Sequence, residues 1–210
     1  MTEGKITTIQ TLENIDLDKP FICMLNLKGS HPWFAITKDG YYTNYQIKTL
    51  QLLKIPFEVK VKEHNAIIWD EYVDGSTFSF LEELYPLRKE NKFVKTISAS
   101  IWGSLCKGAI SERFEHQFTK EMLPYYVTSD YNKGIVKLNF YGRPYKFATA
   151  RLKTFLWSYS RFRFINDYLL PVKNAGYDIY HINVDAFITD CNEDEIIKLV
   201  NYGKYHSPRF

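Results

Sequence analysis

The segment YDIYHINVDAFIT, residues 177–189, contains two short runs of strand-forming residues on either side of Asn183-Val-Asp-Ala186. Ile, Tyr, Phe and Thr favour strands, and two such runs around a tight turn indicate a β-hairpin. Asp185 would then lie at the hairpin tip, held rigidly at the edge of a sheet. Its carboxylate suits a hard cation such as Mg²⁺, although Asp is also a common turn residue.

Helices are predicted on both sides of this hairpin. Residues 149–170 carry aromatic and aliphatic side chains near one face with basic residues between them, and Pro171 is expected to end this helix. Residues 192–201 begin with an acidic turn, as helices often do. The apolar face of the first helix predicts a core contact through Phe155, Tyr159, Phe162 and Ile165.

The N-terminal part of the chain is predicted to form strands around one helix. Residues 20–28 are predicted to form a strand, and Thr43 can cap a helix that ends near Ile55, ahead of Pro56. Residues 57–61 and 66–73 are predicted to pair as a hairpin.

A helical stretch over residues 76–107, kinked at Pro86, carries a cluster of cations. Arg88, Lys92 and Lys95 are spaced by four and three residues, so a continuous helix places them on one face. Such a face could bind a triphosphate through charge-assisted hydrogen bonds, or it could simply be solvated. Small residues follow it, and they would allow a base pair to approach the backbone: Ala99, Ser100 and Gly103.

Composition places the chain among folded, soluble proteins. Of its 210 residues, 45% are hydrophobic and 24% are charged, which excludes a disordered chain. The net charge of +3 is too small to identify a partner by itself, while the aromatic content of 17% supplies either core or base-stacking faces. Three separated cysteines and no long apolar run predict an intracellular protein that is not in a membrane.

Two motifs in this order resemble family B DNA polymerases. The segment KTISASIWG, residues 95–103, is similar to the fingers signature K-x-x-x-N-S-x-Y-G, with Ala99 in place of Asn and Trp102 in place of Tyr. The segment INVDAFIT, residues 182–189, resembles the palm motif Y-x-D-T-D-S, with Asp185 at the second acidic position. The resemblance covers roughly residues 30–200, and the protein-primed branch is the most similar.

This resemblance implies an α+β fold with an antiparallel palm-type sheet, packed helices and a short helical fingers element. Residues 1–75 and 109–210 would form the two parts of the palm, and residues 76–108 the fingers. The family's reaction is DNA synthesis by two-metal nucleotidyl transfer, so the implied partners are primer-template DNA, deoxynucleoside triphosphates and Mg²⁺. The implied roles are metal binding and catalysis by Asp185, catalysis by Lys95, and nucleotide binding by Arg88, Lys92, Lys95, Ser100, Trp102 and Gly103.

The chain departs from the family at its metal site. A second carboxylate comes from the family's motif D-x-x-S-L-Y-P, and the nearest segment by spacing, NLKGSHP at residues 26–32, has Asn26 in that place. Asn183 also replaces the first Asp of the palm motif. One Asp provides too few ligands for two ions, so the isolated chain is expected to be incomplete.

Three functions therefore remain open on the sequence. The chain could be part of a polymerase that a second chain or a missing segment completes. It could be a non-catalytic palm-like module that binds primer-template DNA or a protein. It could also be a basic, aromatic-rich domain that binds single-stranded nucleic acid.

Overall fold

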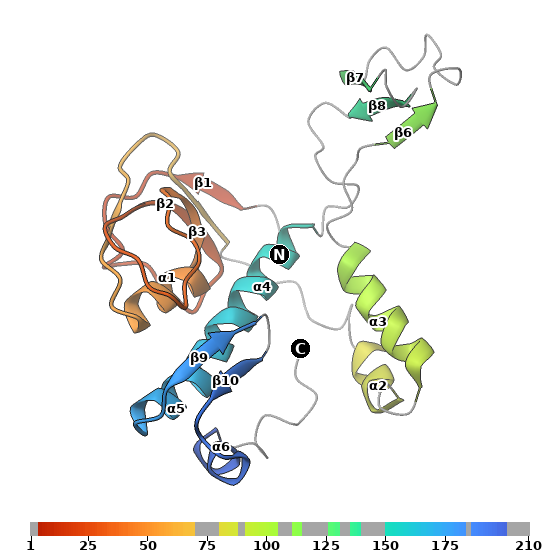
Figure 1. Ribbon diagram of the computed structural model, residues 1–210. Helices are drawn as coiled ribbons and strands as arrows, with labels where there is room; N and C mark the ends of the chain where they lie inside the picture. The colour runs from red at the N-terminus through yellow and green to blue at the C-terminus, as the bar shows by residue number, and fades with distance from the viewer. Residues whose placement is uncertain are drawn as a thin grey trace. The chain divides into compact units, whose positions relative to one another are not determined.

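The computed structural model describes residues 4–69, 80–87, 91–104, 111–114, 126–130, 135–139, 150–183 and 186–200. These residues form helices and antiparallel sheets, so the α+β class predicted from the sequence is confirmed (Figure 1). The chain divides into two compact units, and each is described by itself. The first unit contains residues 1–86 and 155–210, and the second contains residues 87–154.

The N-terminal sheet of the first unit is built around its longest strand. Strand β2 pairs with three others, and every pairing in the sheet is antiparallel. The order is β1-β5-β2-β3, with β4 also on β2. The strands are β1 (Lys5–Thr7), β2 (Phe21–Leu27), β3 (Gly40–Thr43), β4 (Phe57–Val59) and β5 (Ala66–Ile68).

The core of this sheet follows from the alternation along β2. Phe21, Cys23 and Leu25 are buried, because alternate side chains of a strand point to the same face. Helix α1 (Asn44–Leu52) adds Ile47 and Leu50 to the same cluster. Its N-terminus is fixed by the predicted cap: Thr43 Oγ1 accepts from the N–H of Gln46, and the Gln46 side chain accepts from the N–H of Thr43.

The predicted hairpin of residues 57–61 and 66–73 is wrong. Strands β4 and β5 do not pair with each other; they lie end to end along one edge of β2. Met24 marks the junction, since its carbonyl accepts from Lys60 N–H and its N–H donates to the carbonyl of Asn65, both at 2.9 Å. The residues between β4 and β5 form a loop that leaves the sheet, and β2 is long enough to pair with both strands.

A long helical rod begins with α4 (Ala150–Phe164) and continues through a π-helical turn (Ile165–Leu169) into α5 (Leu170–Asn174). The prediction that Pro171 ends the helix is wrong, because Pro171 lies in the first turn of α5. The N–H of Leu170 donates to the carbonyl of Ile165, five residues back. This wider register accommodates the proline, which has no N–H to donate and would crowd the carbonyl of an ordinary α-helical turn.

The rod packs against the N-terminal sheet region through aromatic side chains. The ring of Phe155 meets that of Trp69 edge to face at 5.5 Å between centroids, and the ring of Tyr159 lies 4.8 Å from that of Tyr45. Phe155 and Ile165 are buried and Tyr159 and Phe162 are half-buried, so the predicted core face of this helix is confirmed in part. These contacts join two stretches of chain that are far apart in the sequence.

The predicted C-terminal hairpin is present, formed by β9 (Ile179–Ile182) and β10 (Phe187–Thr189) in antiparallel pairing. Helix α6 (Glu193–Leu199) follows, with Asn192 as its N-cap. Val172 of α5, Cys191 and Val200 form a second, smaller core here. None of the helices that the structure describes is long and apolar enough to cross a membrane.

Helix α2 (Phe80–Leu87) ends at the boundary of the second unit, which then contains helix α3 (Lys92–Ser104). The prediction of one helix kinked at Pro86 is wrong, because Asn91 separates α2 from α3. Asn91 Oδ1 accepts from the N–H groups of Phe93 at 2.9 Å and Val94 at 3.4 Å, as an N-cap does.

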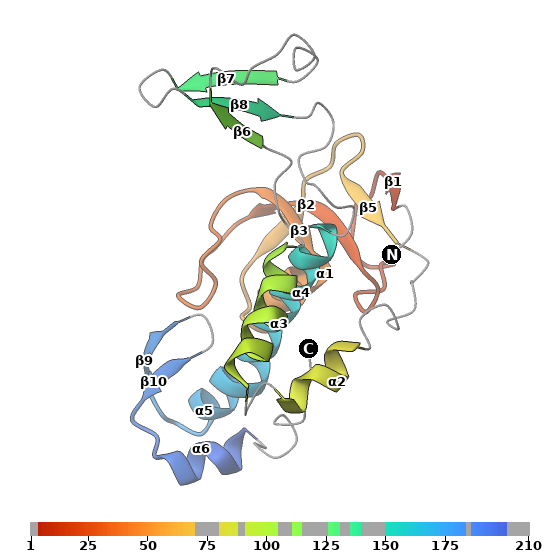
Figure 2. The same ribbon diagram turned by 90° about the vertical axis from the view of Figure 1, so that its right-hand side faces the viewer.

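The second unit also contains a three-stranded antiparallel sheet (Figure 2). Its order is β6-β8-β7. A strand was expected from residue 135 onward and is present, whereas the other two strands were not predicted. The strands are β6 (Ser111–Phe114), β7 (Tyr126–Asp130) and β8 (Ile135–Asn139).

Candidate functional site

Helix α3 carries the part of the predicted nucleotide site that the structure describes. Lys92, Lys95 and Ala99 follow one another at spacings of three and four residues, so they share one helix face, and all three are exposed. Arg88 lies outside the described residues, so the structure does not test its place beside the two lysines.

The small residues of α3 are also exposed. Ser100 and Gly103 are open to solvent, and a Cβ added to Gly103 would meet no atom within 4 Å among the described residues. Packing within the described residues therefore does not require glycine at this position. The backbone of Trp102 is helical, and its side chain lies outside the described residues.

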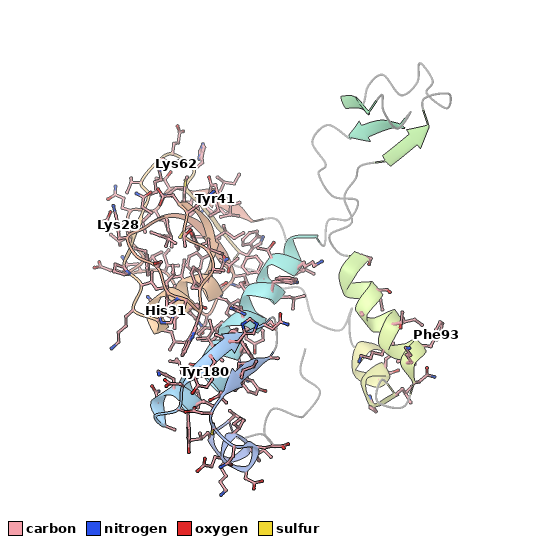
Figure 3. The ribbon with its side chains drawn as sticks, in the orientation of Figure 1. Lys28, His31, Tyr41, Lys62, Phe93 and Tyr180 are labelled. Carbon is pink, nitrogen blue, oxygen red and sulfur yellow. The ribbon has the colours of Figure 1, made fainter. Side chains whose placement is uncertain are left out.

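A second face of α3 is apolar and lies opposite the lysines. Phe93 on this face (Figure 3) is 71% exposed. Ile97, four residues further along the helix, is 36% exposed. The helix thus has one cationic face and one apolar face, which is the pattern of an element that lies between a polar ligand and an apolar support.

The hairpin of β9 and β10 closes as the sequence predicts. The N–H of Asn183 donates to the carbonyl of Ala186 at 2.8 Å, directly beyond the last strand pair, Ile182 with Phe187. Asp185, the predicted metal ligand, falls between these two residues and lies outside the described part of the chain. The structure therefore describes the frame of the turn around Asp185 and not its carboxylate.

Asn26, which stands in place of the family's second carboxylate, lies near the end of β2 opposite Glu58. Its Oδ1 is buried and has no hydrogen-bond partner among the described residues. A buried polar atom without a partner costs free energy, so such an atom calls for an explanation.

The described residues do not by themselves fit a two-metal site. Among them, no group of three or more His, Cys, Asp and Glu side chains is arranged to hold a metal ion. The Asn26 amide oxygen could ligate Mg²⁺, but it carries no charge to balance the ion.

The sequence did not predict a groove between the loop after β2 and the start of β9. It has a volume of about 450 Å³, and both of its walls belong to the first unit. The groove is lined by His31, Pro32, Trp33, Lys173, Asp178, Ile179 and Tyr180. The only sequence signal was the density of aromatic residues in two segments about 145 positions apart, and nothing in the sequence joined them.

Burial lowers the pKa of one group that lines this groove and of one that is hydrogen-bonded to its wall. The His31 ring accepts a hydrogen bond at Nδ1 from the N–H of Trp33 at 3.1 Å, and burial lowers the pKa of this histidine. Burial also lowers the pKa of Arg161, which donates to the carbonyl of Trp33 at 3.2 Å. The imidazole is thus favoured in its neutral form, as a ring that can stack.

Comparison with models of known protein families, with curated proteins and with solved structures gives no match to the chain.

Proposed function

We propose that the chain is the palm-and-fingers portion of a family B DNA polymerase, which synthesises DNA when a further segment or a partner chain completes its metal site. The observation that carries this proposal is the hairpin of β9 and β10. Its closing hydrogen bond, from Asn183 N–H to the Ala186 carbonyl at 2.8 Å, brings together the two residues that flank the segment with Asp185. The resemblance of residues 182–189 to the palm motif assigns the metal ligand to this turn.

Helix α3 gives the second support. Lys95 and Lys92 would neutralise the phosphates of an incoming nucleotide, and the exposed backbone at Ser100 and Gly103 would let the new base pair approach. Phosphoryl transfer depends mainly on positioning and on charge neutralisation, and these are the tasks that the side chains of α3 can perform. Mg²⁺, when bound, would activate the primer hydroxyl and stabilise the leaving pyrophosphate.

The first experiment is extension of a labelled primer on a template by the purified chain with Mg²⁺ or Mn²⁺. Extension that Asp185→Asn abolishes would establish polymerase activity in this chain alone. Extension that survives Asp185→Asn would come from a contaminating enzyme or from a site other than the one proposed.

A binding measurement tests the proposal even where the isolated chain is inactive. The chain should bind primer-template DNA, and Lys95→Ala should weaken deoxynucleotide binding to that complex about tenfold or more, as loss of a charge-assisted contact does. Lys62→Ala, at an exposed lysine of the first unit, is the matched control. Equal affinity of the wild type and Lys95→Ala, or absence of duplex binding, would refute the proposal.

Asn26 offers a gain-of-function test. Asn26→Asp introduces the carboxylate that the family motif has, so added Mg²⁺ should raise its melting temperature and support primer extension. Asn44→Asp is a matched control, because Asn44 also has a buried Oδ1 without a partner in the described part of the chain. A Mg²⁺ response in neither variant would place Asn26 outside the metal site.

Asn26 also favours a second candidate, a palm-like module without catalysis, because its amide carries no charge to balance a metal ion. Such a module would bind primer-template DNA equally well with and without Mg²⁺, and Asp185→Ala would leave this binding unchanged. The third possibility, a domain for single-stranded nucleic acid, would give stronger binding to single strands than to a duplex, with a steep dependence on salt.

A further inference from the structure

The groove of the first unit has two walls from distant parts of the chain. One wall is the loop after β2, with His31, Pro32 and Trp33, and the other is the start of β9 with the preceding turn, including Asp178, Ile179 and Tyr180. Figure 3 shows His31 and Tyr180 on neighbouring segments of this unit. The groove thus has an aromatic side chain on each wall.

A β-bulge directs Tyr180 into the groove. In the register of β9 with β10, His181 pairs with Ile188 and Ile179 pairs with Thr189, so Tyr180 is an extra residue without an opposite partner. Consecutive residues of a regular strand point to opposite faces, yet Ile179 and Tyr180 both line the groove. The bulge accounts for this, and bulges are found where a side chain must be redirected near a functional site. Tyr180 remains 66% exposed, so its ring is available to a ligand.

Hydrogen bonds hold the opposite wall, the loop with His31 and Trp33, in place. Arg161 of α4 donates to the Trp33 carbonyl at 3.2 Å, and the N–H of Phe34 donates to the His31 carbonyl at 2.9 Å. The rings of His31 and Trp33 meet edge to face at 5.2 Å between centroids. This loop is therefore an ordered aromatic wall, and little conformational entropy would be lost when a flat ligand packs against it.

At the rim of the groove lies the carboxylate of Asp178, whose charge is balanced by Lys173. Asp178 Oδ1 lies 2.7 Å from Lys173 Nζ, and the Asp178 N–H donates to Asp190 Oδ1 at 2.8 Å. A carboxylate accepts several hydrogen bonds, so Asp178 can still accept from a donor on a ligand. The aromatic side chains on both walls and the acceptor at the rim together suit a flat ring that bears an amino group.

We propose that this groove binds an unpaired nucleobase of a single-stranded nucleic acid, with its ring against Tyr180 and its amino group donating to Asp178. Cytosine, adenine and guanine carry such an amino group and thymine does not, so the groove prefers these three bases to thymine. A proline-rich peptide also fits aromatic walls, but its prolines have no N–H to offer Asp178. The proposal rests on the chain acting on nucleic acid, and it adds a contact separate from the hairpin tip and from α3.

The test measures binding of fluorescent oligodeoxycytidine to the full chain by anisotropy. Tyr180→Ala should weaken binding about fivefold to a hundredfold, the effect of losing one stacked base, while Tyr180→Phe should bind like the wild type. Tyr41→Ala is the matched control, since Tyr41 is an exposed tyrosine on strand β3. An abasic oligonucleotide of the same length should bind the wild type and Tyr180→Ala equally.

The Asp178 contact is tested by base preference. The wild type should bind oligodeoxycytidine more tightly than oligothymidine, and Asp178→Asn should reduce this ratio. Asp18→Asn, which removes another exposed carboxylate paired with a lysine, should leave the ratio unchanged. Circular dichroism and melting temperature verify that each variant is folded.

Three results would overturn the proposal. These are unchanged binding in Tyr180→Ala, an equal loss in Tyr41→Ala, and a loss of the same size with the abasic strand. Binding of a polyproline peptide that Tyr180→Ala abolishes, with oligonucleotide binding intact, would assign the groove to a peptide instead. None of these assays requires catalysis, so failure of primer extension and failure of the groove are separate outcomes.

Discussion

Asn65 shows how a single buried side chain can define the edge of a sheet. It is fully buried, and its Oδ1 accepts from the N–H of Ile9 while its Nδ2 donates to the carbonyls of Ile9 and Lys60, at 2.8, 2.8 and 3.0 Å. These bonds attach the segment after β1 to the loop between β4 and β5. This one amide therefore supplies three of the hydrogen bonds that position the segment between β4 and β5.

We therefore expect Asn65→Ala to lower the free energy of unfolding by about 2–3 kcal/mol, because it leaves three backbone groups without this partner. Urea denaturation followed by circular dichroism measures the change. Asn174→Ala, at an exposed position at the end of α5, should cause no loss. Equal stability of Asn65→Ala and the wild type would mean that water replaces the amide.

At the scale of one element, helix α1 ends in a conformation that suits glycine better than the residue present. The N–H of Ile55 donates to the Leu50 carbonyl at 2.9 Å and the N–H of Lys54 to the Gln51 carbonyl at 3.1 Å, which is the Schellman pattern. Lys54 has a φ of 54°, in the left-handed region. A side chain at this position costs free energy that glycine avoids.

Lys54→Gly should raise the free energy of unfolding by about 0.5–1 kcal/mol, since the relief of backbone strain exceeds the entropy that glycine adds to the unfolded chain. Thermal unfolding measures it as an increase in melting temperature. Lys62→Gly is the control, because the φ of Lys62 is not positive and only the entropy cost remains. A lower melting temperature for Lys54→Gly would contradict this account.

At the scale of the first unit, stability depends on the contact between the two chain segments that form it. Phe155 is buried, and its ring packs edge to face on that of Trp69, from the other segment. Two residues further along the same helix, Trp157 is 66% exposed. The two aromatic residues therefore form a matched pair for testing this contact.

Phe155→Ala should lower the free energy of unfolding by about 3–5 kcal/mol, through lost burial and the cavity left behind. Trp157→Ala should change it by less than about 0.5 kcal/mol, as exposed substitutions usually do. Denaturant unfolding measured by circular dichroism gives both values. A small effect of Phe155→Ala would show that the two segments fold independently.

The local elements were largely predictable from the sequence because their signals are local. The cap at Thr43, the strand predicted at residues 20–28 and the two strands around the turn at residues 183–186 each depend on neighbouring residues, and each is confirmed. Strand pairing was less predictable, since two short strands separated by a loop can pair with each other or with a third strand. The hairpin predicted at residues 57–73 was wrong for this reason.

The predicted site residues are only partly described. Lys92, Lys95, Ser100 and Gly103 share one helix, as their spacing indicated. The roles of Lys95 and Asp185 stay predictions, because they come from a resemblance. The groove could not have been predicted, since a bulge at Tyr180 and a hydrogen bond from Arg161 to a distant loop leave no local signal in the sequence.

The sequence by itself determined the caps and most of the predicted strand positions, because local spacing and propensity decide these features, while the α+β class was expected from the resemblance. The tertiary structure alone decided which strands share β2, how the helix continues through Pro171 beyond a π-turn, and which aromatic side chains line the groove. Those outcomes depend on competition between distant segments for the same hydrogen bonds and the same buried surface. Such competition leaves no repeating pattern in the sequence from which its outcome could be predicted.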